Sequence, residues 1–249
     1  MIINGKEWTR QEIAARIDHT VLAPDATRAD VENACIQARE YGFKAVFTNP
    51  YWTPLVADLL DGSGVAAGIS AAFPLGSLSS AAKAFEVEDV LSRVKDGSLC
   101  AVDMVTNVAL LKERRYEEYT RDIHEVVKAT VGREGMVVKA ILETALLEPD
   151  EIIAACFCAA EAGVDFVKTS TGRGGAPDLY HLRLMKGVLP PEVGVKFSGF
   201  GTHDCAELAF MAFVMGADLI GTPRGPWIVD TLCDRYARLA GSFLHPAGA

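Results

Sequence analysis

The strongest constraint on the fold is a regular alternation between short apolar runs and longer amphipathic stretches. Strand-like runs lie near residues 16–22, 44–48, 66–73, 100–107, 136–143, 164–170, 193–198 and 218–222. Helix-like stretches lie near residues 28–41, 52–61, 81–96, 114–131, 149–162, 178–187, 203–215 and 225–239. Strands that each precede a helix, eight times over, are what a (β/α)8 TIM barrel requires. We therefore predict a single α/β domain over residues 1–249, with the barrel at about 16–240.

Two local patterns refine this prediction. Thr9 and Glu12 form a capping box, which predicts a short helix before the barrel begins. The rival architecture, an open doubly wound sheet, needs a glycine-rich turn after its first strand. Residues 18–24 do not supply such a turn, so we favour the barrel.

Composition sets the broad class of the protein. Half of the residues are hydrophobic, which is enough for one large core. The formal net charge is −9 and no basic block occurs, so nucleic acid and anionic membranes are not expected partners. No apolar run reaches about 18 residues, and the first residues do not resemble a signal peptide. We therefore expect a cytoplasmic protein without a membrane span.

The cysteines and histidines do not predict a metal site. The six cysteines lie mostly within predicted helices and strands, which is typical of buried, reduced thiols. Cys156 and Cys158 have the wrong spacing for a zinc knuckle, and the five histidines are scattered. We expect neither a metal nor another cofactor.

Charged side chains interrupt four consecutive apolar runs that should line a barrel interior. They are Asp103, Lys139, Lys168 and Lys196. Their spacing of roughly 30 residues corresponds to one strand and one helix. A charge in such a run is unfavourable unless it pairs with an opposite charge or takes part in catalysis or binding. One carboxylate beside three amines predicts amine chemistry, in which a lysine attacks a carbonyl carbon.

The alternation of side chains along a strand indicates where these charges point. In the fifth strand, Lys139 shares a face with Val137, Ile141 and Glu143. Inward-pointing faces would bring the charges together near the C-terminal ends of the strands, where catalytic groups of TIM barrels lie. The alternative is that each lysine points outward, but the outer face is covered by helices and is also a poor place for a charge.

Several segments resemble the deoxyribose-phosphate aldolase family. The segment 167–172, VKTSTG, resembles the family's Schiff-base lysine motif. Other segments resemble family motifs in the same order: IDHT at 17–20, FPLG at 73–76, VDMV at 102–105, VKAILET at 138–144 and VKFSG at 195–199. The resemblance covers residues 16–222 and implies a metal-independent class I aldolase that forms a Schiff base.

The resemblance also implies roles for individual residues. Lys168 would carry the imine, with Asp103 and Lys196 as its proton-relay partners. Supporting positions would be Lys139, Asp18 and Thr171. The physical argument agrees, because a nucleophilic lysine must be neutral for part of the time, and both desolvation and a nearby ammonium disfavour its charged form.

The implied reaction is the reversible cleavage of 2-deoxy-D-ribose 5-phosphate to D-glyceraldehyde 3-phosphate and acetaldehyde. The protein would thus act in carbohydrate and deoxyribonucleotide degradation. Its expected partners are a small aldehyde or sugar phosphate and, by the same resemblance, a second copy of the chain in a homodimer.

The chain departs from the family pattern at the phosphate end. Phe200 stands where the family has a second glycine, and Pro223 replaces a residue that would offer a backbone N–H. Two arginines could compensate, because arginine binds phosphate in a bidentate manner. The predicted phosphate-binding residues are Gly172, Arg173, Gly199, Gly201, Gly221 and Arg224.

Two alternatives remain open at this point. A Schiff-base aldolase of the same family could act on a non-phosphorylated or carboxylated aldol, which the departures at Phe200 and Pro223 would suit. A barrel without catalytic activity could bind sugars instead. The presence of Asp103, Lys168 and Lys196 together disfavours this alternative.

Overall fold

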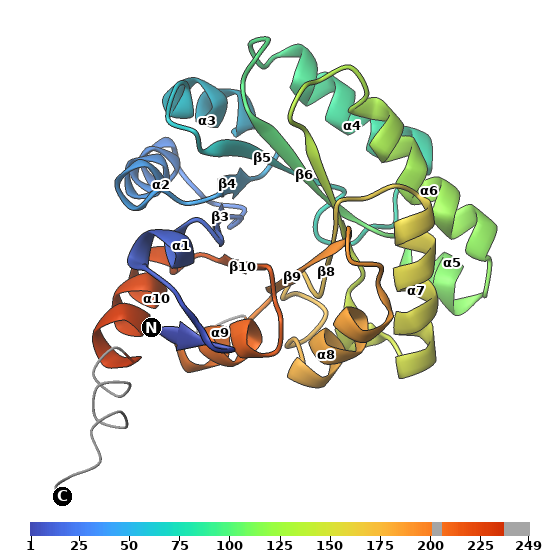
Figure 1. Cartoon of the computed structure of the whole chain (residues 1–249). Helices are drawn as coiled ribbons and strands as arrows, with labels where there is room; N and C mark the ends of the chain where they lie inside the picture. Colours follow the sequence, from blue (N-terminus) through green and yellow to red (C-terminus); the bar gives the residue numbers. More distant parts are fainter. Residues whose placement is uncertain (201–205, 237–249) are drawn as a thin grey trace, which may run out of the picture.

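The computed structural model describes residues 1–200 and 206–236, and its centre is a closed barrel of parallel strands (Figure 1). The strands are hydrogen-bonded in the order β10-β3-β4-β5-β6-β7-β8-β9. Their bounds are β3 (Ile17–Val21), β4 (Ala45–Thr48), β5 (Ala66–Ala71), β6 (Cys100–Val105), β7 (Val137–Ile141), β8 (Phe166–Lys168), β9 (Gly194–Ser198) and β10 (Leu219–Thr222). The predicted α/β TIM barrel is confirmed.

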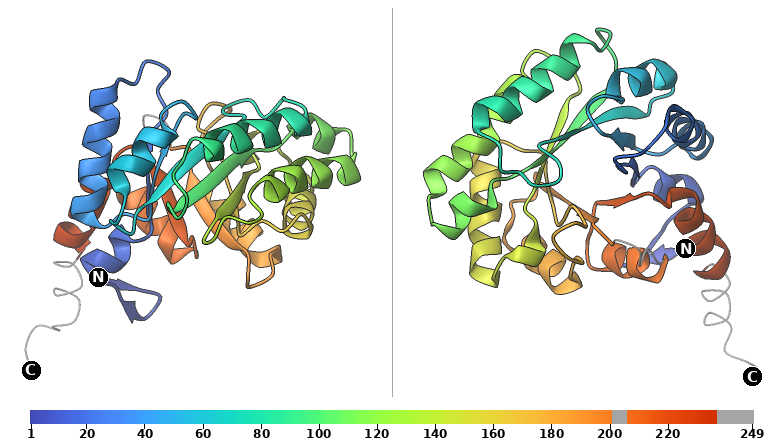
Figure 2. Two further views of the ribbon diagram at one scale, coloured as in Figure 1. Left: turned by 90° about the horizontal axis from the view of Figure 1, so that it is seen from above. Right: turned by 180° about the vertical axis from the view of Figure 1, so that it is seen from behind.

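Helices form the outer layer of the barrel, as Figure 2 shows from two further directions. The larger helices are α2 (Arg28–Tyr41), α3 (Thr53–Leu60), α4 (Ser80–Ser92), α6 (Tyr116–Ala129), α7 (Pro149–Glu161), α8 (Leu179–Val188), α9 (Ala206–Val214) and α10 (Gly225–Thr231). Shorter turns are α5 (Val108–Lys112), the 3-10 turn η1 (Thr144–Leu146) and the π turn η3 (Leu232–Tyr236). The main apolar core lies between this layer and the strands, because parallel strands are covered on both faces.

The N-terminal segment precedes the barrel as a hairpin and a short helix. The strands β1 (Ile2–Ile3) and β2 (Lys6–Glu7) pair in antiparallel fashion. The helix α1 (Arg10–Ala14) begins with the predicted capping box, in which Thr9 and Glu12 bond to each other's backbone. The Asn4 side chain donates to the Val214 carbonyl at 2.9 Å, so the hairpin contacts the end of α9. The hairpin itself was not among the predicted elements.

The strand register places the four predicted charges opposite one another in two pairs on neighbouring strands. Asp103 of β6 is opposite Lys139 of β7, and Lys168 of β8 is opposite Lys196 of β9. All four are buried. The prediction that these side chains point inward and meet is therefore confirmed by their mutual contacts, described below.

A phenylalanine ring forms an apolar wall beside this charged layer. Phe47 of β4 belongs to a small apolar cluster that is separate from the main core. The Nζ atoms of Lys196 and Lys139 lie 4.0 Å and 4.5 Å from the centroid of its ring, within cation–π range. A Cβ at the neighbouring Gly68 would come within 2.4 Å of this ring, so glycine makes room for it.

Candidate active site

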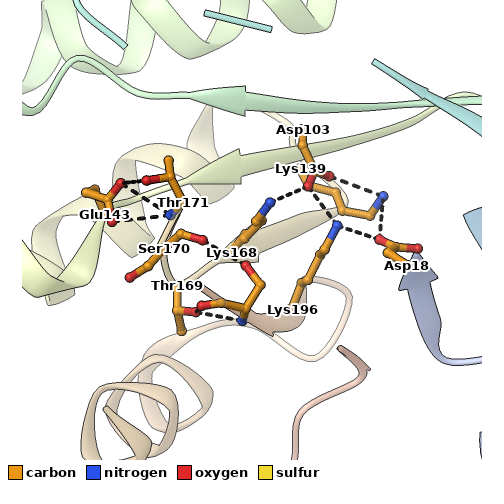
Figure 3. Close-up of polar contacts among 10 residues, drawn as sticks. Asp18, Asp103, Lys139, Glu143, Lys168, Thr169, Ser170, Thr171 and Lys196 are labelled. Atoms are coloured by element: carbon orange, nitrogen blue, oxygen red, sulfur yellow. Dashed lines mark hydrogen bonds and ion pairs between the residues drawn. The ribbon is translucent and has the colours of Figure 1, made fainter. Parts of the chain in front are cut away.

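Asp103 is the centre of the charged layer (Figure 3). Its Oδ2 accepts hydrogen bonds from Lys168 Nζ and Lys196 Nζ, each at 2.7 Å. Lys139 Nζ lies 3.5 Å from the other oxygen, Oδ1. One carboxylate on β6 thus contacts three ammonium groups from the next three strands.

Asp18 of β3 supplies a second carboxylate to the same network (Figure 3). Its Oδ2 lies 2.7 Å from Lys196 Nζ and 3.3 Å from Lys139 Nζ. Lys196 reaches Asp18 across the intervening strand β10, where a Cβ at Gly221 would lie 2.7 Å from Lys196 Cε. The absence of a side chain at Gly221 therefore permits this contact.

The formal charges of the network do not balance when every group is ionised. Three lysines and two aspartates carry one excess positive charge in a space with almost no solvent access. Loss of one proton from a lysine removes that excess. A low-dielectric interior favours such neutralisation.

The charged form of Lys168 is less stable than that of Lys196. Burial lowers its pKa from 10.5 to about 8, and the Lys196 ammonium acts in the same direction against the attraction of Asp103. For Lys196, burial is outweighed by Asp103 and Asp18, and its pKa is raised above 10.5. Burial alone would raise the pKa of Asp103, but the three ammoniums outweigh it and hold that pKa below 3.8. Lys168 can therefore be a neutral amine while its neighbours stay charged.

An open cleft of about 830 Å³ lies over this network at the C-terminal ends of the strands. Of the five charged residues in the network, only Lys168 lines it. The other lining residues come from the end of β3 and the segment that leads into α2, from Phe73, from the loop after β8, and from the ends of β9 and β10 with the residues that follow them. A carbonyl compound in the cleft would thus meet the Lys168 amine, with Asp103 and Lys196 directly behind it.

The structure brings most of the predicted phosphate residues to this cleft. Gly172 and Gly199 both have positive φ, 81° and 93°, and a Cβ at Gly172 would lie 3.0 Å from Gly199 Cα. Arg173 and Gly221 also line the cleft. Gly201 lies outside the described residues.

Arg224 does not line the cleft with the other predicted residues. Its guanidinium lies over the Trp227 ring, 4.3 Å from the centroid. Phe200 is buried, packs 5.1 Å from the Phe197 ring centroid and forms an apolar part of the cleft wall. The arginine nearest to the cleft is therefore Arg173.

Glu143 was not predicted as a site residue, yet its carboxylate bonds to the loop that follows Lys168 (Figure 3). It accepts from the Thr171 backbone N–H at 3.2 Å and from the Thr171 hydroxyl. The same hydroxyl accepts from the Arg173 N–H at 3.0 Å. Its place on the Lys139 face, directly after a strand, was the signal in the sequence that could have indicated this role.

Two negative observations apply to residues 1–200 and 206–236. No helix there is long and apolar enough to cross a membrane. Within the same residues, no three His, Cys, Asp or Glu side chains are grouped so that they could hold a metal ion.

Comparisons with known proteins agree with this geometry. The chain is 44% identical over 223 residues to a deoxyribose-phosphate aldolase from Carboxydothermus hydrogenoformans, covering 89% of this chain and 95% of the relative. It is 42% identical to one from Enterococcus faecalis, covering 88% and 96%. The tetrameric deoxyribose phosphate aldolase from Aeropyrum pernix superposes with a TM-score of 0.81 at 29% identity, covering 91% of this chain and 93% of that one.

The model of the DeoC/LacD family aldolases matches residues 13–221, which include the whole charged network. With relatives above 40% identity over most of its length, the chain is an aldolase, a lyase of carbon–carbon bonds, and it belongs to the DeoC/LacD family.

Proposed function

We propose that this aldolase cleaves 2-deoxy-D-ribose 5-phosphate reversibly to D-glyceraldehyde 3-phosphate and acetaldehyde through a Schiff base on Lys168. The observation that carries the proposal is the position of Lys168 Nζ, at the base of the cleft and 2.7 Å from Asp103 Oδ2. The relatives named above are deoxyribose-phosphate aldolases, which supports the choice of substrate.

The first step is attack on the open-chain aldehyde of the sugar. Neutral Lys168 Nζ adds to C1, and the carbonyl oxygen receives a proton. Loss of water from this adduct then leaves a protonated imine. Asp103 and Lys196 lie behind the amine, where they can take and return these protons, either directly or through a water.

The second step breaks the bond between C2 and C3. A base removes the proton from the C3 hydroxyl, the C2–C3 electrons move toward the imine nitrogen, and glyceraldehyde 3-phosphate leaves. The remaining enamine is protonated at carbon and hydrolysed to acetaldehyde and free Lys168. We assign the proton transfers to the pair Asp103 and Lys196. Asp18 and Lys139 hold that pair in place and keep it charged.

The phosphate would lie at the opposite end of the cleft from the imine. Gly172 and Gly199 allow the backbone to approach an anion closely, and Arg173 brings a positive charge to the same side. Arg224 lies over the Trp227 ring and does not line the cleft, so we give it the smaller part in phosphate binding.

A second candidate substrate is a non-phosphorylated or carboxylated aldol, processed through the same imine. Phe200 adds an apolar wall, and Pro223 in the same cleft lacks a backbone N–H. Asp25 and Asp30 also line the cleft, and their negative charge disfavours a phosphate near them. These observations favour a less anionic acceptor than the first proposal does.

The imine is tested by adding acetaldehyde and sodium borohydride and then measuring the intact mass. We expect one ethyl group per chain, located on Lys168 by peptide mapping. The variant Lys168→Met should carry no label, while Lys186→Met, a lysine paired with Asp218 outside the barrel, should be labelled as the wild type is. A label on Lys196 or Lys139 with Lys168 unmodified would contradict the proposal.

The substrate is tested by comparing acetaldehyde release from 2-deoxyribose 5-phosphate with release from free 2-deoxyribose. A strong preference for the phosphorylated sugar supports the first candidate. Equal rates for both sugars would favour the second.

A further inference from the structure

Glu143 combines three properties that its position after β7 does not require. Its backbone is left-handed, with φ 57°, which is an unfavourable conformation for a residue with a side chain. Its carboxylate is buried, with the residue 4% exposed. No lysine or arginine within the described part of the chain pairs with it, and its hydrogen bonds all go to Thr171. A strained, buried carboxylate with one partner indicates a specific task.

Through Thr171, the carboxylate is linked to the part of the cleft wall that Thr171, Gly172 and Arg173 form. The Thr171 hydroxyl donates to Glu143 and accepts from the Arg173 N–H at 3.0 Å. The hydroxyl therefore acts as a donor and as an acceptor at the same time, which fixes its orientation. The Gly174 backbone also packs close to the carboxylate, since a Cβ at Gly174 would lie 3.1 Å from Glu143 Cδ. The segment 171–174 is therefore shaped around Glu143.

We infer that Glu143 is a positioning residue that selects for an anionic group on the substrate. By ordering Thr171, it holds Gly172 and Arg173 in the arrangement in which both line the cleft. The inference rests on the proposed function, because it assumes that this end of the cleft receives the terminal phosphate. Glu143 itself would not touch the phosphate, which its own charge would repel.

The chemistry of the hydrogen bonds predicts which substitutions preserve the role. Glutamine can accept both Thr171 donors through Oε1, whereas alanine accepts neither. In the same way, Thr171→Ser keeps the hydroxyl and Thr171→Val removes it. Glu143→Gln and Thr171→Ser are therefore matched controls for Glu143→Ala and Thr171→Val.

The readout is the ratio of kcat/KM for 2-deoxyribose 5-phosphate to kcat/KM for free 2-deoxyribose. We expect Glu143→Ala and Thr171→Val to lower this ratio by about tenfold or more, mainly through KM of the phosphorylated sugar, since loss of an ordered charge-assisted contact has that magnitude. Glu143→Gln and Thr171→Ser should stay near the wild-type ratio. Asp150→Ala, an exposed carboxylate at the start of α7, should leave it unchanged.

Combining Glu143→Ala with Thr171→Val tests whether Glu143 acts through Thr171. The double variant Glu143→Ala/Thr171→Val should lower the ratio no further than either single change, because both remove the same link. Additive losses would overturn the inference, as would a folded Glu143→Ala enzyme with a wild-type ratio. Should Glu143→Ala fail to fold, an unchanged ratio in Thr171→Val overturns it instead.

Failure of the proposed function gives a different pattern. A wild-type enzyme that forms the imine with acetaldehyde but does not prefer the phosphorylated sugar overturns the inference and leaves the imine chemistry intact. Absence of the imine overturns the proposed function. In that case calorimetric titration with inorganic phosphate still decides the inference, because Glu143→Ala should bind phosphate about tenfold more weakly than Glu143→Gln.

Discussion

At the scale of single residues, the site depends on one lysine that loses its proton more easily than its neighbours. Lys168 shares Asp103 Oδ2 with Lys196, yet only Lys196 has a second carboxylate within 2.7 Å. Burial lowers the pKa of Lys168 to about 8, whereas the second carboxylate raises the pKa of Lys196 above its usual value. Lys168 therefore loses its proton at a lower pH than Lys196 does.

The first prediction concerns the pH dependence of imine formation. Because the pKa of Lys168 is lowered to about 8, its amine is protonated below that pH and neutral above it. The rate of borohydride trapping with acetaldehyde should therefore fall by about tenfold per pH unit below about 8 and level off above it. A trapping rate that is constant between about pH 6 and 9 would contradict the lowered pKa.

The second prediction concerns Lys196. Lys196→Leu removes the neighbouring ammonium, so the pKa of Lys168 should rise and the relay should lose its donor. Turnover at pH 7 should fall by about 100-fold or more. Raising the pH should restore part of the imine trapping rate but not the full turnover. This difference separates the effect on the pKa of Lys168 from the loss of the proton donor. Lys186→Leu, at a half-buried ion pair outside the barrel interior, is the control. Normal turnover by a folded Lys196→Leu enzyme would show that Lys196 has no catalytic role.

At the scale of elements, the site is assembled by the ends of parallel strands and the loops that follow them. The register pairs Asp103 with Lys139 and Lys168 with Lys196, and period-two alternation predicted that all four side chains would point inward. The loops are less regular. After β7 the chain leaves the strand through the left-handed Glu143, so this side chain turns to the next loop instead of continuing the alternation.

The third prediction concerns the loop after β8. Arg173→Ala should raise KM for 2-deoxyribose 5-phosphate by about tenfold or more and change it little for the free sugar, because a charged contact to the phosphate is lost. Arg224→Ala should have a smaller effect, since Arg224 stacks on Trp227. Steady-state kinetics with both sugars measures the difference. A phosphate preference that survives loss of both arginines would show that backbone N–H groups suffice.

The N-terminal hairpin is an element that sequence reasoning missed. Its turn is Asn4-Gly5, with φ values of 51° and 77°, and this dipeptide is a strong hairpin signal. The strands on either side have only two residues each, too few to show an alternating pattern. Tertiary contacts, such as that of Asn4 with α9, stabilise a hairpin that the local sequence would leave marginal.

At the scale of the whole molecule, the burial of Lys168 works against the stability of the fold. A pKa lowered from 10.5 to about 8 means that folding disfavours the charged form of Lys168 by about 3 kcal/mol at neutral pH. This penalty is complete below pH 8, where both states are protonated. It decreases as the pH rises from about 8 toward 10.5 and disappears when both states are neutral.

The fourth prediction follows from this penalty. Lys168→Met should abolish trapping but raise the melting temperature at pH 7 by several degrees, at about 2–4 °C per kcal/mol for a chain of this size. The gain should shrink as the pH approaches 10.5. Scanning calorimetry over this pH range measures it, with Lys186→Met as the control. A lower melting temperature for Lys168→Met at pH 7 would show that the ion pair with Asp103 outweighs the penalty.

The fifth prediction is the homodimer. The resemblance to the family implies it, and one similar structure is described as tetrameric. Sedimentation velocity should give a species of about twice the chain mass. A species at the mass of one chain or of four would show that the prediction is wrong.

The amino-acid sequence by itself determined the barrel and the meeting of its charges. Eight strand and helix units leave a closed parallel barrel as the arrangement that covers every apolar face. Asp103, Lys139, Lys168 and Lys196 then point to the same interior, because side chains alternate along each strand and the units have similar lengths. The hypothesis of chemistry at a lysine rests on these local rules.

Tertiary structure alone decided which groups lie beside one another within that interior. Closure of the barrel brings Asp18 of the first barrel strand to Lys196 of the seventh, across a glycine of the eighth. It also decided that Lys168 lines the cleft, that Glu143 bonds to Thr171, and that Arg224 lies on Trp227. These outcomes depend on barrel closure, on loop conformation and on the packing of side chains from distant segments, none of which periodicity along the chain encodes.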